Sequence, residues 1–132
     1  MIVVDSSALI AIFFREPEGL AFQDRIDGDE RCVISAVNVH ETACVLRGRL
    51  GAVAVDGFWR WLVENELEIA PFDEAQVQAA AAAFDRYGKG ISSAARLNLA
   101  DCAAYALAKT LNAPLLFKGE DFTSTDIARA SS

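Results

Sequence analysis

Histidine and cysteine are scarce in this sequence. The 132 residues include one histidine, His40, and three cysteines that form no CxxC pair. Because Cys44 stands where the second histidine of an HExxH zinc helix would be, a zinc peptidase is disfavoured. A serine nucleophile at Ser6 or Ser7 would need a histidine base, and we expect His40 to face away. The cysteines predict buried thiols in a reducing, cytoplasmic protein.

Two further features are missing. No GxxxxGK[ST] phosphate loop occurs, and no apolar run approaches the roughly 20 residues of a membrane span. The apolar opening MIVVDSSALIAIFF has no basic leader and contains Asp5. We therefore interpret it as a strand and a buried helix rather than a secretory signal, and expect no membrane association.

Basic residues are outnumbered, 12 Lys and Arg against 19 Asp and Glu, and the net charge is −7. This balance argues against broad attraction to nucleic acid, which needs clustered positive charge. However, two segments, 42–55 and 86–100, contain basic residues and no acid. They could flank an acidic centre as phosphate contacts or be ordinary solvated charges, and the residues concerned are Arg47, Arg86, Lys89 and Arg96.

Short β-branched or apolar runs alternate with helical segments along the chain. Four runs are predicted strands, and they are Ile2–Val4, Cys32–Ile34, Leu67–Ala70 and Leu115–Phe117. Alternation of this kind predicts an α/β fold whose parallel sheet binds ligands beyond the carboxyl ends of its strands. With 53% hydrophobic residues, we expect one domain over residues 1–132.

Polar and proline residues mark the expected helix starts. Each of these residues suits a cap or a first turn, and they are Ser6 or Ser7, Pro17, Ser35, Asp73 and Asn98. In the helix after Ser35, the spacing of Val37, Glu41 and Cys44 predicts that Glu41 shares an inward stripe.

Four carboxylates fall where the strands of such a sheet end. Asp5 and Asp121 follow strands, whereas Glu41 and Asp101 lie early in helices. Crowded carboxylates resist ionisation, and a hard divalent cation relieves their repulsion. The pattern predicts a Mg²⁺ or Mn²⁺ site. For Asp101, the helix dipole offers a purely structural explanation.

The segments that carry these acids resemble a known family. In order, they read IVVDSSALIAI, SAVNVHETACVL, RLNLADCAAYALAK and LLFKGEDFTSTDIA. They resemble the four acidic motifs of PIN-domain ribonucleases, and in particular the VapC-like toxins of bacterial toxin–antitoxin pairs. The resemblance covers essentially the whole chain and implies a three-layer α/β/α sandwich with a parallel sheet of four or five short strands.

The resemblance also implies an activity. Asp5, Glu41, Asp101 and Asp121 would be the metal-binding and catalytic set, and Ser7 would hold a carboxylate or a metal-bound water. The expected activity is Mg²⁺-dependent endonucleolytic cleavage of RNA such as tRNA, with Mn²⁺ able to substitute. A cognate antitoxin that inhibits the enzyme and a homodimer are the expected assemblies.

The sequence departs from the family pattern at a few positions. Ala100 and Ala103 replace a frequent glycine and a frequent aromatic residue, which concerns packing more than ligation. Glu120 beside Asp121 leaves open which of the two reaches a metal. Asp126 could be a further ligand, although we expect it to cap a last helix.

Two alternatives of other classes stay open. One is a non-catalytic metal-binding or partner-binding α/β module, for which an aromatic cluster at Phe58, Trp59 and Trp61 could form a partner surface or a dimer seam rather than core. The other is a receiver-like phosphoacceptor domain with Lys118 as its lysine, although Asp73 sits in a poor acceptor turn.

Overall fold

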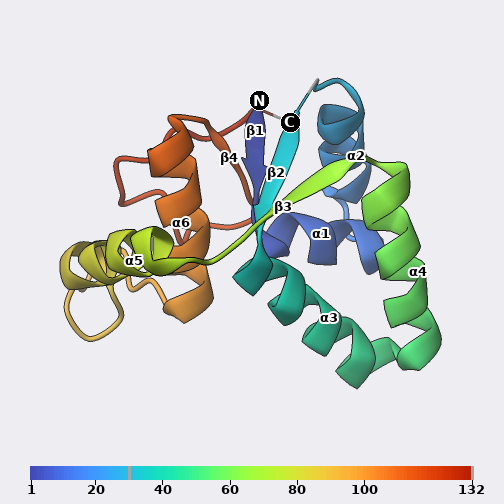
Figure 1. Cartoon of the computed structure of the whole chain (residues 1–132), viewed down its shortest axis with the longest axis horizontal. Helices are drawn as coiled ribbons and strands as arrows, with labels where there is room; N and C mark the ends of the chain where they lie inside the picture. The colour runs from blue at the N-terminus through green and yellow to red at the C-terminus, as the bar shows by residue number, and fades with distance from the viewer. Residues whose placement is uncertain (30, 132) are drawn as a thin grey trace.

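The computed structural model describes residues 1–29 and 31–131, and its centre is a parallel sheet (Figure 1). The strands occur in the order β3-β2-β1-β4, with bounds Ile2–Val4 for β1, Cys32–Ser35 for β2, Leu67–Ala70 for β3 and Leu115–Leu116 for β4. Val3 pairs with both Val33 and Leu115, so β1 is a central strand. The four predicted strands are confirmed, with Phe117 just outside β4.

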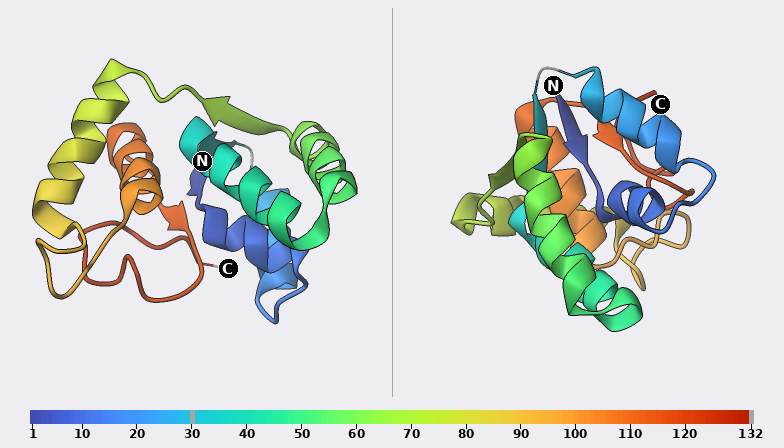
Figure 2. Two further views of the ribbon diagram at one scale, coloured as in Figure 1. Left: turned by 90° about the horizontal axis from the view of Figure 1, so that it is seen from below. Right: turned by 90° about the vertical axis from the view of Figure 1, so that its right-hand side faces the viewer.

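Helices cover both faces of this sheet. Their bounds are Ser6–Phe13 for α1, Gly19–Asp27 for α2, Ala36–Leu50 for α3, Ala52–Glu64 for α4, Glu74–Tyr87 for α5 and Leu99–Leu111 for α6. Figures 1 and 2 show α5 and α6 on one side of the sheet and α1 to α4 on the other. No helix within the described ranges is long and apolar enough to cross a membrane.

The strand residues divide between two cores. Val3 and Val33 pack with the α5 and α6 side chains, whereas Val4 and Ile34 pack with the side chains of α1 to α4. Successive side chains of a strand point to opposite faces, so a strand between two helical layers must be apolar throughout. This arrangement confirms the predicted three-layer α/β/α sandwich.

Two helix starts differ from the prediction. Asp5, rather than Ser6 or Ser7, caps α1, because its extended backbone lets its carboxylate accept the Ser7 backbone N–H. Helix α2 begins at Gly19 instead of Pro17. The Gly19 N–H donates to the carbonyl of Glu16 at 2.9 Å, which closes a turn that contains Pro17. The caps predicted at Ser35, Asp73 and Asn98 are confirmed by side-chain hydrogen bonds.

The aromatic residues of α4 face mostly inward. Phe58 is fully buried, and Trp61 packs edge-on against Phe13 with ring centroids 5.5 Å apart. Trp61 Nε1 also donates to Gln23 Oε1 at 3.2 Å. Only Trp59 among the three is exposed. The aromatic cluster is therefore mainly core, which removes most of the surface proposed for a binding module.

Candidate active site

Asp5 lies at the carboxyl end of β1, between β2 and β4. The chain leaves β1 toward β2 and β3 and returns to its other side in β4, so Asp5 sits where the strand order reverses. Such reversals form crevices that bind ligands. The side chain is buried, and its Oδ2 accepts hydrogen bonds from the Ser7 N–H at 3.0 Å and the Ser7 hydroxyl at 2.6 Å. Its Oδ1 is buried without a partner among the described residues.

The surroundings of Asp5 disfavour its negative charge. The pKa of Asp5 is raised to about 7, mainly by burial; the Ser7 hydrogen bonds act to lower it, and the charges of Asp101 and Glu41 act to raise it. A buried carboxylate close to two other acids is stabilised by a proton or by a bound cation. The unpaired Oδ1 is the atom through which a cation would satisfy it.

Asp101 caps the start of α6 and also belongs to the group of neighbouring acids. Its backbone N–H donates to Asn98 Oδ1 at 2.8 Å, and its Oδ2 accepts the Asn98 N–H at 3.0 Å, which completes a capping box. The pKa of Asp101 is raised to about 6, mainly by burial; the Asn98 hydrogen bond acts to lower it, and the charges of Asp121 and Glu41 act to raise it. The structural cap and the acidic centre therefore coexist, since Oδ1 is not used by the cap.

The remaining acids approach this pair from α3 and from the segment after β4. Glu41 is half-buried on α3 and acts electrostatically on both Asp5 and Asp101. Asp121 is exposed and follows Gly119, whose φ of 93° permits the turn after β4. The fold thus brings the predicted acids together from four separate segments: Glu41 and Asp101 act on Asp5, and Glu41 and Asp121 act on Asp101.

A cavity of about 410 Å³ opens beside Asp101 and has charged walls of both signs. Its lining comprises Lys89, Ala94, Ala95, Arg96, Asn98, Asp101, Glu120 and Asp121. The cavity therefore holds two of the four acids, the neighbouring Glu120 and two of the four basic residues singled out in the sequence. This juxtaposition of carboxylates with Lys and Arg suits a phosphate diester close to a metal ion.

A hard divalent cation fits the chemistry of these residues. Among the described residues, no three His, Cys, Asp or Glu side chains are arranged to hold a metal ion by themselves. Mg²⁺ does not require such a cage, because it keeps several waters and uses only one or two carboxylates. The free Oδ1 of Asp5 can act as an oxygen ligand. The raised pKa values of Asp5 and Asp101 indicate that their negative charges are disfavoured without a cation nearby.

The structure places the other two basic candidates away from the acids. The Arg86 guanidinium stacks over the Tyr87 ring at 4.9 Å and lies 3.8 Å from Asp126 Oδ2. Arg47 lines a separate cavity with His40 and Cys44. Of the four predicted phosphate contacts, Lys89 and Arg96 alone line the cavity beside Asp101.

Asp126 has a structural role elsewhere. It accepts hydrogen bonds from the Tyr105 hydroxyl and from Lys109 Nζ, the latter at 3.1 Å. The Tyr105 hydrogen bond is the main reason that the pKa of Asp126 falls to about 2. No helix follows α6 in the described part of the chain, so the expectation that Asp126 caps a last helix is wrong.

The predicted position of Cys44 is also wrong. The buried residues of α3 include Asn38, Thr42 and Leu46, whereas Cys44 is exposed. At 100° per residue, the inward stripe passes beside Glu41, which leaves Glu41 at its edge and Cys44 outside it. Cys44 Sγ lies 3.8 Å from His40 Nε2 on this outer face, away from the residues that α3 buries.

Lys118 does not play the part that a receiver domain requires. Its Nζ lies 2.9 Å from Glu16 and 3.2 Å from Glu18, both in the segment between α1 and α2. Asp73 is similarly engaged, since it caps α5 through the Gln76 N–H. Neither residue is available for the phosphoacceptor chemistry that the receiver alternative invoked.

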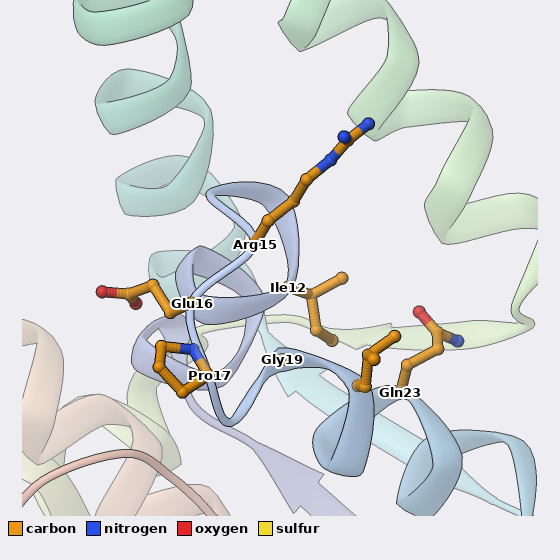
Figure 3. A pocket seen from close by; sticks show the side chains of 7 residues that line it. Ile12, Arg15, Glu16, Pro17, Gly19 and Gln23 are labelled. Atoms are coloured by element: carbon orange, nitrogen blue, oxygen red, sulfur yellow. The ribbon is translucent and has the colours of Figure 1, made fainter.

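A larger cavity lies elsewhere and lacks this chemistry. It measures about 540 Å³ and is lined by Ile12, Arg15, Glu16, Pro17, Gly19, Leu20 and Gln23. In Figure 3, Arg15 and Glu16 point in different directions around the turn between α1 and α2. This cavity contains none of the four acids, so size alone does not identify the candidate active site.

Sequence reasoning missed one buried polar residue near the acids. Asn38 is fully buried on α3, and its Nδ2 donates to Ser6 Oγ at 3.0 Å and to the Ala100 carbonyl at 3.2 Å. An asparagine on a buried helical stripe, one turn before Glu41, is the signal that could have identified it, since buried amides need partners.

Comparison with known proteins defines the class to which this fold and acidic edge belong. The family model described as PIN domain matches residues 2–128. VapC ribonuclease Mb0640 of Mycobacterium bovis is 40% identical over 126 residues, which cover 96% of this chain and 95% of that protein. Ribonuclease VapC of Mycolicibacterium smegmatis is also 40% identical over 126 residues, with 96% and 97% coverage. The chain therefore belongs to the VapC ribonuclease toxins of the PIN-domain family.

Solved structures agree on the fold. VapC20 of Mycobacterium tuberculosis, described as a Sarcin-Ricin loop cleaving toxin, superposes with a TM-score of 0.83 at 13% identity and full coverage of both chains. A chain of the DNA-bound VapBC structure from Salmonella typhimurium gives a TM-score of 0.71 at 15% identity, covering 97% of this chain and 94% of that one. At such low identity these structures support the fold rather than a substrate.

Proposed function

We propose that this protein is a Mg²⁺-dependent endoribonuclease toxin that hydrolyses RNA phosphodiesters with a metal-activated water. The observation that most supports metal dependence is the buried Asp5. Its Oδ1 has no partner among the described residues, and its charge interacts with those of Asp101 and Glu41. The chain's membership of a family of ribonucleases supports RNA as the substrate.

In this proposal, Asp5 and Asp101 hold the ion, and Glu41 and Asp121 hold its waters or a second ion. Ser7 keeps Asp5 in place through its two hydrogen bonds, so the carboxylate presents Oδ1 to the ion. When bound there, Mg²⁺ would lower the pKa of a water and neutralise phosphoryl charge. Mn²⁺ is expected to substitute because it accepts similar oxygen ligands.

The RNA backbone would enter along the cavity beside Asp101. Lys89 and Arg96 line that cavity and would contact phosphate oxygens of the RNA backbone. The net charge of −7 makes such local contacts more important than general attraction. Structured RNA, including tRNA, is the proposed substrate class.

The natural partner is proposed to be a cognate antitoxin protein that inhibits cleavage. Several structural neighbours were solved as toxin–antitoxin complexes, including one from Klebsiella pneumoniae with a TM-score of 0.72 and 16% identity over 96% of this chain and 93% of that one. We also propose a homodimer, which light scattering on the purified protein would test.

Incubation of purified protein with RNA tests the activity. Parallel reactions would contain Mg²⁺, Mn²⁺ or EDTA, and each would include Asp101→Asn as the matched variant. Internal cleavage with either metal, abolished by EDTA and by the substitution, is the expected result. No cleavage with any metal would favour the non-catalytic module instead.

A further inference from the structure

Asn38 joins three segments that carry the acids. Its side chain is fully buried where α1, α3 and α6 meet. One Nδ2 hydrogen bond reaches Ser6 Oγ, directly after Asp5, and the other reaches the carbonyl of Ala100, directly before Asp101. On its own helix, Asn38 lies one turn before Glu41, so a single amide group connects the neighbourhoods of three carboxylates.

The geometry is specific to an amide. An amide nitrogen has two donors, and both are used here, toward a hydroxyl oxygen and a backbone carbonyl. The Ser6 hydroxyl in turn donates to the backbone carbonyl of Asn38 at 3.3 Å, so α1 and α3 are joined by hydrogen bonds in both directions. Asn38 Oδ1, by contrast, is buried without a partner among the described residues.

An amide at this buried position leaves one acceptor unpaired among the described residues. A buried polar atom without a partner disfavours the folded state, and an apolar residue of the same shape would avoid that loss. The sequence nevertheless has an asparagine at a position that faces the core, where the neighbouring buried residues of the helix include Val39 and Leu46. The two donated bonds are what distinguish asparagine from leucine at this position.

We propose that Asn38 is a positioning residue that fixes Asp5, Asp101 and Glu41 relative to one another for metal binding. This proposal rests on the proposed function of the acidic site. Asn38 acts through the Ser6 and Ala100 bonds and does not itself contact an ion or substrate. The placement of the carboxylates matters because groups that hydrogen-bond to metal ligands hold these ligands in position. Mutation of such groups typically reduces metal affinity or activity by about 10–100-fold.

Asn38→Leu is the direct test, because it keeps the number and branching of the side-chain heavy atoms and removes both donated bonds. We expect Mn²⁺ affinity, measured by isothermal titration calorimetry, to fall about tenfold or more. With saturating Mn²⁺, kcat for a short RNA should fall while KM changes little, since the RNA contacts are elsewhere. Circular dichroism and thermal melting establish that the variant is folded.

Two further variants separate positioning from general damage to α3. Thr42→Val removes the 2.8 Å hydrogen bond from Thr42 Oγ1 to the backbone carbonyl of Asn38. It leaves the bonds from the Asn38 side chain to Ser6 and Ala100 in place. It should keep wild-type Mn²⁺ affinity and kcat. Ser6→Ala removes one of the two bonds and should weaken Mn²⁺ binding in the same direction as Asn38→Leu, and it decides the question if Asn38→Leu does not fold.

The outcomes also distinguish this proposal from the proposed function. If wild-type protein binds Mn²⁺ but cleaves no RNA, the ribonuclease function fails, and the Mn²⁺ affinities still decide the role of Asn38. If wild type cleaves RNA and folded Asn38→Leu and Ser6→Ala retain its affinity and kcat, positioning by Asn38 is overturned. Equal losses in Thr42→Val would overturn it as well.

Discussion

The Ser7 hydroxyl lies 2.6 Å from Asp5 Oδ2 and accepts the backbone N–H of Lys118 at 3.0 Å. One small side chain thus connects the carboxylate at the end of β1 with the chain just after β4. Because Ser7 is itself held by Lys118, the carboxylate has a fixed orientation in which Oδ2 is occupied and Oδ1 is free. The pairing explains how a buried acid can be presented for ligation without a basic partner.

Ser7→Ala should reduce RNA cleavage by about 10–100-fold near neutral pH, because it frees the Asp5 carboxylate. The hydrogen bond from the hydroxyl lowers the pKa of Asp5 in the native protein, so its loss in the variant should make Asp5 ionise at higher pH. The acidic limb of its pH–rate profile should therefore move upward. Ser7→Thr retains the hydroxyl and is the matched control, and an unaltered profile in Ser7→Ala would contradict this role.

Protonation of Asp5 should make the stability of the metal-free protein depend on pH. The folded-state pKa is raised from 3.8 to about 7, so the folded protein binds the extra proton between these values. The stabilisation is complete below about pH 4 and is lost as pH rises through 7. Asp5→Asn should flatten this dependence and stabilise the protein at pH 8 by on the order of 2–4 kcal/mol.

Urea unfolding across this pH range in EDTA measures the effect. Asp24→Asn on exposed α2 surface is the control, and it should retain the wild-type slope. If Asp5→Asn unfolds with the same pH dependence as wild type, Asp5 is not the titrating group.

Mg²⁺ or Mn²⁺ should raise the melting temperature of the wild-type protein. An ion that binds only the folded state stabilises it by about 2.7 kcal/mol at a concentration 100 times its dissociation constant. The shift should vanish in Asp101→Asn, whereas Asp126→Asn should retain it, because Asp126 is engaged with Tyr105 and Lys109. A melting temperature that is the same with and without Mg²⁺ or Mn²⁺ would argue against a preformed site.

The fold was largely predictable because its signals are local. The apolar run Ile2–Val4 and the caps at Ser35, Asp73 and Asn98 each depend on a few neighbouring residues. The recurrence of acids at strand ends, supported by the family resemblance, identified the residues that the fold brings into electrostatic range.

What the sequence could not show depends on tertiary contacts. The first helix has several candidate caps, and Asp5 takes the role because its Oδ2 already faces the Ser7 N–H. The position of Asn38 on a buried helical stripe signals that its amide needs partners, but the sequence does not show which, since both partners are distant in sequence. Arg86 and Arg96 lie in one basic segment, and only the folded chain shows that Arg96 lines the acidic cavity while Arg86 stacks on Tyr87.

Cys44 should be the fast-reacting thiol of the native protein. It is exposed, whereas burial raises the pKa of Cys32 and raises that of Cys102 to about 11, so the latter two hold little thiolate. Titration with an aromatic disulfide reagent should modify one thiol rapidly and all three after unfolding. Cys44→Ser should lose the rapid phase, and a rapid phase that persists would place the reactive thiol elsewhere.

Lys89 and Arg96 should contribute to RNA affinity, and Arg86 should not. Lys89 and Arg96 line the cavity that contains Asp101 and Asp121, whereas Arg86 faces Asp126 and Tyr87. Each phosphate contact that is lost should raise KM for RNA and reduce the slope of log affinity against log salt by about 0.7 for a single strand.

Lys89→Ala, Arg96→Ala and Arg86→Ala form a matched series, because each removes one positive charge from the segment 86–100. Binding is best measured in the inactive Asp101→Asn background across a range of salt concentrations, so that cleavage does not interfere. If RNA attraction were a matter of total charge, the three variants would weaken binding equally. A loss confined to Lys89→Ala and Arg96→Ala would instead show that RNA follows the cavity beside Asp101, because these two basic residues line it together with Asp101 and Asp121.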